Sequence, residues 1–308
     1  MSLNVDGKSN IVKQLIIAKF FLTHKADCII SYRSVPNFIL LLPLYFTKTP
    51  KIIVSERNTT IVPNFREKIN YNILYKRANH IVPNSHTQAK YLLSLNKVWK
   101  DRITTITNYT DIDKFSIKSI PDSTDIIKIG VFARIFPQKN YERFCYVLSK
   151  LKTISNRKFC VYWYGDRKEG EFVKGSKHIR ELIKKCNLSD VLKIEDSVTN
   201  VSEYMNLFHV MCLPSLYEGF SNSISEYICC GKAVLCSDVS DNHIMVHDGV
   251  NGFLFDPTDI DSMCNAFCKF FNLSHSQIVG MGIESRKIAE KLFDKDTFTD
   301  SYIKLIED

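Results

Sequence analysis

The chain has 308 residues and is 45% hydrophobic, which is enough for two domain cores of ordinary size. Its net charge of +8 is uneven, since residues 1–120 hold 18 Lys and Arg against 7 Asp and Glu (+11), and residues 121–308 hold 23 against 26 (−3). No nucleic-acid-binding motif or aromatic stacking set accompanies the basic residues, which excludes nucleic acid as the expected partner. Ten irregularly spaced cysteines in a long chain indicate reduced packing residues and exclude a disulfide scaffold.

Strand-like and helix-like segments alternate through residues 1–120. A helical pattern at 11–23 precedes expected strands at 27–31, 51–54, 80–83 and 102–106. The apolar run 35–46 has only 12 residues and contains two prolines, whereas a membrane-spanning helix needs about 20 apolar residues. We therefore expect a core helix there.

The alternation continues after a poorly patterned stretch at 115–123, where Pro121, Asp122 and Ser123 predict an interdomain linker. Further strands are expected at 126–132, 159–164, 191–194, 210–213 and 233–236. This order predicts an α/β protein with parallel sheets covered by helices, divided into domains at 1–120 and 121–290.

Two cations follow the expected strand 126–132. Arg134 can bind phosphate oxygens in a bidentate way, and Lys139 adds a mobile point charge at the start of the next helix. This spacing predicts a phosphate site at the strand end.

Two carboxylates flank a second strand-to-helix turn, in the segment 214–226. Glu218 lies in the expected loop, Gly219 lets the backbone approach a ligand, and Glu226 lies one turn into the following helix. Free amides at the helix start attract phosphate, so the segment suits a sugar bound to a diphosphate. Ser223 and Glu226 also match a simple capping box, which would give Glu226 only a structural role.

Taken together, these motifs resemble the retaining glycosyltransferases of family four. The resemblance rests on Glu-x7-Glu at 218–226, Arg-x4-Lys at 134–139, the run Gly-Lys-Ala-Val-Leu-Cys-Ser-Asp at 231–238 and the segment Val-Asn-Gly-Phe-Leu-Phe-Asp-Pro at 250–257. It implies the GT-B architecture, with two Rossmann-like domains whose parallel sheets face a central cleft, and a helix at 291–308 that packs back towards the N-terminal domain. The N-terminal domain is expected to be incomplete, because about 50 to 70 residues of the usual first strand and Gly-rich loop have no counterpart.

Weaker matches lie in the N-terminal half, at 78–85 and 106–115. The segment Ser55–Asn58 resembles a subgroup that builds bacterial surface polysaccharides, glycolipids and lipid-linked oligosaccharides. That likeness favours a role in polysaccharide, lipopolysaccharide, O-antigen or capsule biosynthesis.

By resemblance, the protein transfers a sugar with retention from a nucleoside-diphosphate sugar, by family tendency a UDP-sugar, to a glycan or a lipid-diphosphate-linked saccharide. Glu226 would hold the ribose hydroxyls and Glu218 would contact the sugar near the reacting centre. The expected catalytic residues are Glu218, Arg134 and Lys139. The expected donor-binding residues are Glu226, Gly219, Phe220, Ser221, Asn222, Arg134 and Lys139, and the acceptor-side candidates are Glu56, Arg57 and Asn58.

No clustered set of His and Cys ligands stands out, so neither a metal nor another cofactor is expected. Length and composition agree with a cytoplasmic enzyme. The basic N-terminal half could meet anionic lipid, which predicts peripheral contact with the membrane; a merely solvated basic surface is the alternative. A second alternative is a truncated, non-catalytic relative that binds a nucleotide or a partner enzyme.

Overall fold

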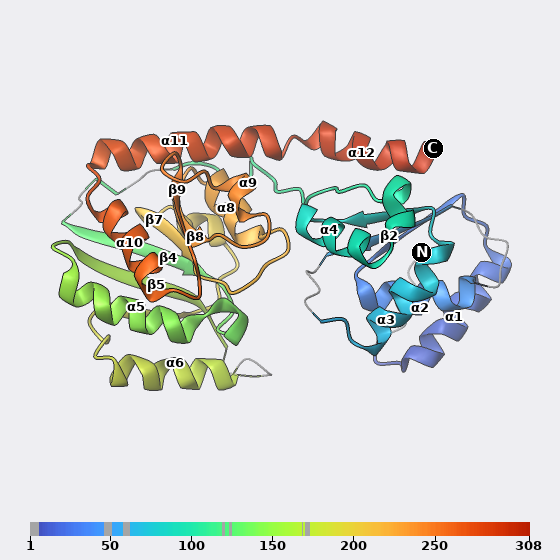
Figure 1. Ribbon diagram of the computed structural model, residues 1–308, viewed down its shortest axis with the longest axis horizontal. Coiled ribbons are helices and arrows are strands. Elements are labelled where there is room, and N and C mark those ends of the chain that lie inside the picture. Colours follow the sequence, from blue (N-terminus) through green and yellow to red (C-terminus); the bar gives the residue numbers. More distant parts are fainter. Residues whose placement is uncertain are drawn as a thin grey trace. The chain divides into compact units, whose positions relative to one another are not determined.

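The computed structural model describes residues 6–45, 51–57, 62–118, 121–122, 125–167, 169 and 173–308. It divides the chain into two units, one of Met1–Asn108 with Asp296–Asp308 and one of Tyr109–Lys295 (Figure 1). The sequence placed the first boundary at 120 and the start of the last segment at 291. In the structure the chain leaves the first unit at Asn108, before the Pro121 region, and returns to it at Asp296.

The first unit is a three-stranded parallel sheet of order β1-β2-β3, covered by helices. Its elements are α1 (Asn10–Thr23), β1 (Cys28–Tyr32), α2 (Ser34–Leu44), β2 (Lys51–Glu56), α3 (Phe65–Asn72), the 3-10 helix η1 (Leu74–Arg77), β3 (His80–Pro83), α4 (His86–Leu95), the 3-10 helix η2 (Lys97–Arg102) and the C-terminal α12 (Lys295–Glu307).

Alternate residues of β2 serve two different cores, as the two-residue period of a strand requires. Ile52 and Val54 pack among residues of α2, η1 and β3. Ile53 points to the other face, where it meets Tyr302 and Leu305 of α12. The C-terminal helix is thus part of the first unit's hydrophobic core.

The expected strand at 102–106 is not formed as a regular strand. Residues 103–106 run beside β3 with one isolated bridge, from Ile103 to Ile81, and two main-chain hydrogen bonds, from Thr104 N to Ile81 O and from Ile106 N to Pro83 O, both at 3.1 Å. Residues 97–102 form η2. Asn96 caps this 3-10 turn by accepting a hydrogen bond from the Val98 amide at 3.1 Å, and Trp99 is buried beneath it. Local capping and the burial of one large ring therefore hold residues 97–102 in a 3-10 helix, which takes Arg102 out of the expected strand.

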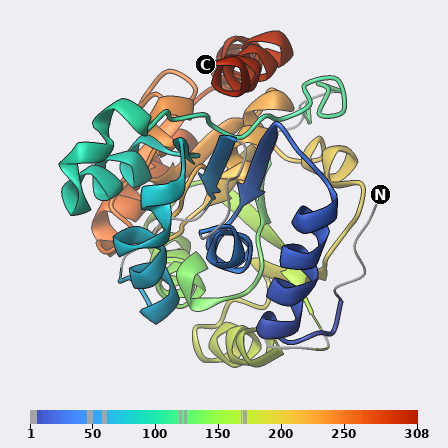
Figure 2. The same ribbon diagram turned by 90° about the vertical axis from the view of Figure 1, so that its right-hand side faces the viewer.

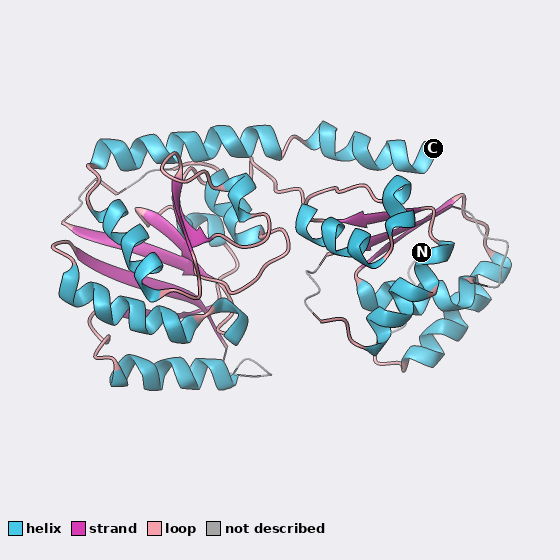
Figure 3. Ribbon diagram, viewed as in Figure 1, coloured by secondary structure: helices cyan, strands magenta, loops and turns pink. Residues whose placement is uncertain are grey.

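The second unit is a six-stranded parallel sheet of order β6-β5-β4-β7-β8-β9, which Figure 3 shows between helices. Its elements are β4 (Ile126–Phe132), the 3-10 helix η3 (Pro137–Lys139), α5 (Tyr141–Ile154), β5 (Lys158–Asp166), α6 (Val173–Lys185), β6 (Leu192–Asp196), α7 (Val201–Met205), β7 (Val210–Leu213), α8 (Asn222–Cys229), β8 (Ala233–Ser237), α9 (Asn242–Met245), β9 (Gly252–Phe255), α10 (Ile260–Phe271) and α11 (His275–Leu292).

Each face of this sheet has its own core, because buried residues alternate along the central strands. Ile127, Ile129 and Val131 of β4 belong to the core beneath α5, α6 and α10. Met211 and Leu213 of β7 belong to the opposite core, beneath α8 and α11. The predicted α/β fold with parallel sheets is confirmed, and the strands at 80–83, 126–132 and 210–213 have the predicted bounds.

The apolar run 35–46 forms α2, whose residues Ile39, Leu41 and Leu44 are buried, so the predicted core helix is confirmed over the described part of the run. Among the helices that the structure describes, none combines the length and apolarity that crossing a bilayer requires.

Candidate functional site

The two sequence motifs meet at the switch point of the six-stranded sheet. From β4 the chain adds β5 and β6 on one side, and then crosses back to place β7 against the other side of β4. In open parallel sheets, ligands bind outside the carboxyl ends of the two strands where the order reverses. Arg134 and Lys139 follow the end of β4, and Glu218 and Glu226 follow the end of β7.

The loop after β4 is fixed by close backbone contacts. The indole Nε1 of Trp163 donates a hydrogen bond to Ala133 O at 2.7 Å. A Cβ at Gly165 would lie 1.9 Å from the same oxygen, and a Cβ at Gly175 would lie 2.1 Å from Ile135 O. These close contacts therefore restrict the main chain on both sides of Arg134, while the Arg134 side chain is exposed.

The loop after β7 is joined to η3 by an ion pair and two hydrogen bonds. Lys139 Nζ contacts the Glu218 carboxylate, and both side chains are largely buried. Gln138 binds this loop twice, since its main-chain oxygen accepts from Leu216 N and its side-chain Nε2 donates to Tyr217 O, both at 2.8 Å. The structure thus brings Lys139 and Glu218 together, although they are far apart in the sequence.

Ser240 holds the same loop from the other side. Its Oγ donates to Glu218 O at 2.5 Å. Its φ of 52° lies in the left-handed region, which is unfavourable for a residue with a Cβ. Such strain persists where surrounding contacts fix it.

Helix α8 begins at Asn222 with Ser221 as its N-cap, whose Oγ accepts from Ile224 N at 3.5 Å. The capping box of Ser223 with Glu226 is therefore not formed. Instead, Ser223 Oγ donates to Phe132 O at 3.0 Å, and Tyr227 Oη accepts from Phe132 N at 2.8 Å. The first turns of α8 are thereby fixed against the end of β4, two residues before Arg134.

Glu226 is half-buried on α8, and burial raises the pKa of its carboxyl to about 7, against a smaller opposite effect of Lys114. A carboxyl group in such a place ionises near neutral pH and can accept hydrogen bonds from ligand hydroxyls.

The remaining donor-side candidates differ in exposure. Gly219 is half-buried and Asn222 is exposed, whereas Ser221 is buried as the cap of α8. The Phe220 ring lies in the core against Phe293, with ring centroids 6.1 Å apart, so only its main chain is available to a ligand.

Of the acceptor-side candidates, Glu56 is buried at the end of β2. Tyr75 donates a hydrogen bond to its carboxylate, and Asn37 Nδ2 donates to Tyr75 Oη at 2.8 Å. Burial raises the pKa of Glu56 to about 7. This network gives Glu56 a packing role in the first unit and leaves 1% of its surface exposed.

Arg57 is half-buried and connects three parts of the first unit. Its guanidinium donates to Asn108 Oδ1 at 2.8 Å and to Tyr302 Oη of α12, and it lies 4.9 Å from the Tyr32 ring centroid. Asn58 lies outside the described residues.

Sequence reasoning missed Gln138, Ser240, Trp163 and Gly165. Gln138 lies inside the Arg-x4-Lys spacing, and Gly165 directly follows the expected strand 159–164, so these two had a sequence signal. The link from Ser240 to Glu218 had none, because it depends on how the ends of β7 and β8 approach each other. Within the described ranges, no three His, Cys, Asp or Glu side chains gather as metal ligands would.

Comparison with known proteins places this site in a family. Residues 126–272 match the sequence model of the family described as glycosyl transferases group 1. The chain is 25% identical over 214 residues to the N-acetylgalactosamine-N,N'-diacetylbacillosaminyl-diphospho-undecaprenol 4-alpha-N-acetylgalactosaminyltransferase of Campylobacter jejuni. The match covers 66% of this chain and 55% of that enzyme, so the chain spans about half the length of this relative.

Solved structures resemble the fold over nearly the whole chain. A glycosyltransferase from Rickettsia africae has a TM-score of 0.82 at 16% identity, covering 100% of this chain and 84% of its own. HepE from Anabaena, solved in complex with UDP and glucose, has a TM-score of 0.82 at 17% identity, covering 95% and 81%. Residues 126–272 therefore form a domain of the glycosyl transferases group 1 family, in a chain with the fold of the GT-B glycosyltransferases.

Proposed function

We propose that the protein transfers a sugar from a nucleoside-diphosphate sugar, with UDP as the nucleotide, to a lipid-diphosphate-linked saccharide or a growing glycan, with retention at the anomeric carbon. The observation that carries the proposal is the convergence of Arg134, Lys139, Glu218 and Glu226 on the switch point of the second sheet. The donor is supported by HepE, whose structure contains UDP and glucose. The acceptor is supported by the Campylobacter relative, whose name describes a saccharide on diphospho-undecaprenol.

The chain's residues suit the charge changes of this reaction. The bond from the anomeric carbon to the diphosphate oxygen breaks, the acceptor oxygen bonds to that carbon, and the acceptor proton is released. Negative charge grows on the diphosphate, where Arg134, Lys139 and the amides at the start of α8 provide fixed positive charge and dipole. Removing one such contact typically costs about 3 kcal/mol in the transition state, roughly a hundredfold in rate.

The Lys139–Glu218 pair places one carboxylate beside one cation in the site. A diphosphate would compete for Lys139 and leave Glu218 to accept hydrogen bonds from the sugar hydroxyls. Glu226, one turn into α8, would bind the ribose hydroxyls. A lipid-linked acceptor further implies peripheral contact with a membrane from the cytoplasmic side, in polysaccharide or O-antigen assembly.

Calorimetric titration with UDP and with GDP tests the donor site. We expect micromolar binding of UDP by the wild type and a loss of at least tenfold, about 1.4 kcal/mol, in Arg134→Ala and in Glu226→Ala. Glu290→Ala is the matched control, because this exposed carboxylate of α11 pairs only with Arg286 of its own helix among the contacts the structure gives it.

Turnover is tested separately, by release of UDP from a UDP-sugar in the presence of a lipid-diphosphate-linked saccharide. Nucleotide binding without release would favour the non-catalytic relative. Absence of nucleotide binding by a folded protein would overturn the transferase proposal for this chain.

A further inference from the structure

Four strongly exposed apolar side chains lie in two short segments of the first unit, 11–15 and 62–65. Val62 and Phe65 are each 80% exposed, Ile11 is 70% exposed and Leu15 is 65% exposed. Among the described large hydrophobic residues, only Val98, at 79%, is as exposed as these four. Single exposed apolar residues are ordinary on a protein surface, but a concentration of large ones marks an interaction site.

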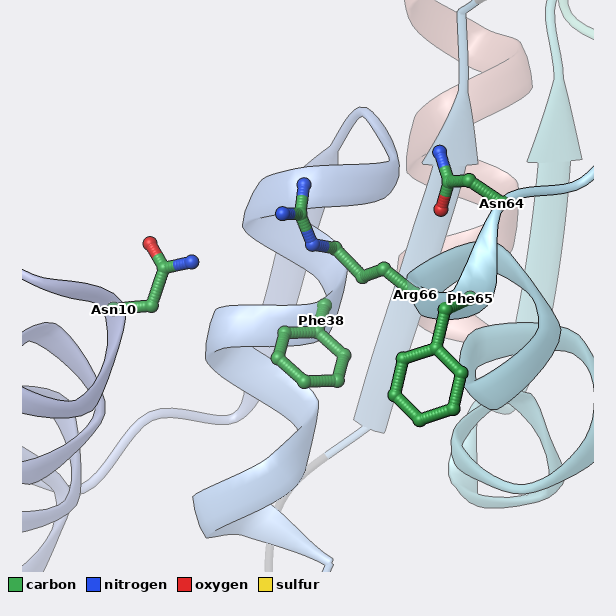
Figure 4. A pocket seen from close by; sticks show the side chains of 5 residues that line it. All are labelled: Asn10, Phe38, Asn64, Phe65 and Arg66. Atoms are coloured by element: carbon green, nitrogen blue, oxygen red, sulfur yellow. The ribbon is translucent and has the colours of Figure 1, made fainter.

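An open pocket joins the elements that carry these residues. It has a volume of about 370 Å³ and is lined by Asn10 at the start of α1, Phe38 of α2, and Asn64, Phe65 and Arg66 at the start of α3 (Figure 4). Ile11 follows the lining residue Asn10, and Leu15 lies one turn further along α1. We call the surface made by Ile11, Leu15, Val62, Phe65 and Arg66 the α1–α3 face.

Arg66 gives this face a positive centre. Its guanidinium carbon lies 6.0 Å from the Phe38 ring centroid, and Figure 4 shows the guanidinium beside that ring in the pocket. Among the described residues, no acidic side chain pairs with Arg66. The neighbouring Glu67 is engaged in the cap of α3, where its carboxylate accepts from the main-chain amide of Asn64 at 2.9 Å.

The surrounding sequence adds further positive charge. Residues 6–25 and 62–72 together hold six Lys and Arg against two acidic residues, a net of +4. Two copies of this chain would bring two such surfaces together and repel each other, whereas an anionic bilayer attracts the basic residues and accepts the apolar ones.

We propose that the α1–α3 face docks on an anionic lipid bilayer, with Phe65 and Val62 entering the interfacial layer and Arg66 binding lipid phosphate. The inference deepens the proposed function, because a lipid-linked acceptor lies in a membrane, and it assigns that contact to named residues. Its evidence, exposure and charge in the first unit, does not depend on the donor site in the second.

Co-sedimentation of the full chain with vesicles tests whether the α1–α3 face docks on a membrane. We expect binding to phosphatidylcholine vesicles that contain about one quarter phosphatidylglycerol, with weak binding to pure phosphatidylcholine and weaker binding as salt is raised. The double variant Val62→Ser/Phe65→Ser should bind about tenfold more weakly, and Arg66→Gln severalfold more weakly.

Val98→Ser is the matched control. Val98 is equally exposed and also has basic neighbours, but it lies on η2, which packs against α4; α4 and α1 lie at opposite sides of the first unit in Figures 1 and 2. This control should bind vesicles like the wild type. UDP binding, measured on the same samples, should be unchanged in all of these variants.

Three results would overturn the inference: no binding of the folded chain to anionic vesicles, equal binding by the double variant and the wild type, or self-association in sedimentation that Phe65→Ser abolishes. If the chain binds UDP but not vesicles, membrane docking by the α1–α3 face is refuted and the donor site is not. If it binds vesicles but not UDP, the proposed donor site is refuted and membrane docking is not.

Discussion

Ser240 binds the loop after β7 although its own backbone is in the left-handed region. Ser240→Ala keeps the left-handed φ of 52° and removes the hydrogen bond to Glu218 O, so we expect a loss of about 1 kcal/mol in the free energy of unfolding. Ser240→Gly also removes the bond but relieves about 1 kcal/mol of strain, so its stability should stay near that of the wild type. Urea denaturation measures both changes.

The two Ser240 variants separate stability from function. Both should lower the rate of sugar transfer, because Glu218 loses a fixed position in each of them. A glycine variant with normal stability and normal turnover would show that the Ser240 hydroxyl does not position Glu218.

We expect Lys232 to make the free energy of unfolding depend on pH. It is fully buried directly before β8, its Nζ donates to Asn206 O at 3.3 Å, and burial lowers the pKa of the amine to about 8. Between pH 8 and the ordinary lysine pKa of about 10.4, the unfolded chain binds the proton and the folded chain does not. The free energy of unfolding should therefore rise with pH across this window, by up to about 3 kcal/mol.

Lys232→Met tests this dependence. Urea denaturation at pH 7 and pH 10 gives the free energy of unfolding of the variant and of the wild type. The variant should be more stable than the wild type at pH 7, and the difference should shrink at pH 10. Buried cysteines such as Cys212, whose pKa is raised by burial, act in the opposite direction, but they are common to both proteins and cancel in the difference. A difference that is constant with pH would show that Lys232 is charged in the folded state.

At the scale of elements, the loop after β4 depends on glycines in the elements beside it. Gly165→Ala would place a Cβ 1.9 Å from Ala133 O, so the loop or the end of β5 must move. We expect a loss of more than about 2 kcal/mol in stability and weaker UDP binding, because Arg134 follows directly. Thermal unfolding and calorimetry measure the two effects.

Gly280→Ala is the matched control for this substitution. Gly280 lies inside α11, and a Cβ there meets nothing within 4 Å. This variant should gain about 0.5 to 1 kcal/mol from helix propensity and bind UDP normally. If Gly165→Ala and Gly280→Ala change stability and UDP binding equally, close packing of Gly165 does not restrict the loop that carries Arg134.

At the scale of the whole molecule, the last helix completes the first unit's core. Tyr302 and Leu305 of α12 pack against Ile53 and Val82. The Arg57 guanidinium donates hydrogen bonds to Asn108, where the chain leaves the unit, and to Tyr302, which follows its return. Tyr302→Phe should keep the ring packing and lose the hydrogen bond from Arg57. Hydrogen exchange in α12 should then become severalfold faster, which corresponds to a loss of about 1 kcal/mol in the free energy of local opening.

Mass-spectrometric hydrogen exchange of residues 296–308 measures the change. Tyr146→Phe, an exposed tyrosine of α5, should leave the exchange of α12 unaltered. Unchanged exchange in Tyr302→Phe would mean that the packing of Tyr302 and Leu305 alone holds the helix.

The fold class and the positions of most strands follow from the sequence alone, because apolar periodicity and turn residues act locally. The strand at 126–132 and the motif residues Arg134 and Glu218 could all be read from one chain without contacts. Other features depend on contacts between elements. Arg102 ends a 3-10 helix and residues 103–106 pair irregularly with β3, the first unit ends at Asn108, and Glu56 is buried beneath Tyr75. Tertiary structure also joins Lys139 to Glu218 and Ser240 to the same loop, since the order of strands alone determines which loops meet at the sheet edge.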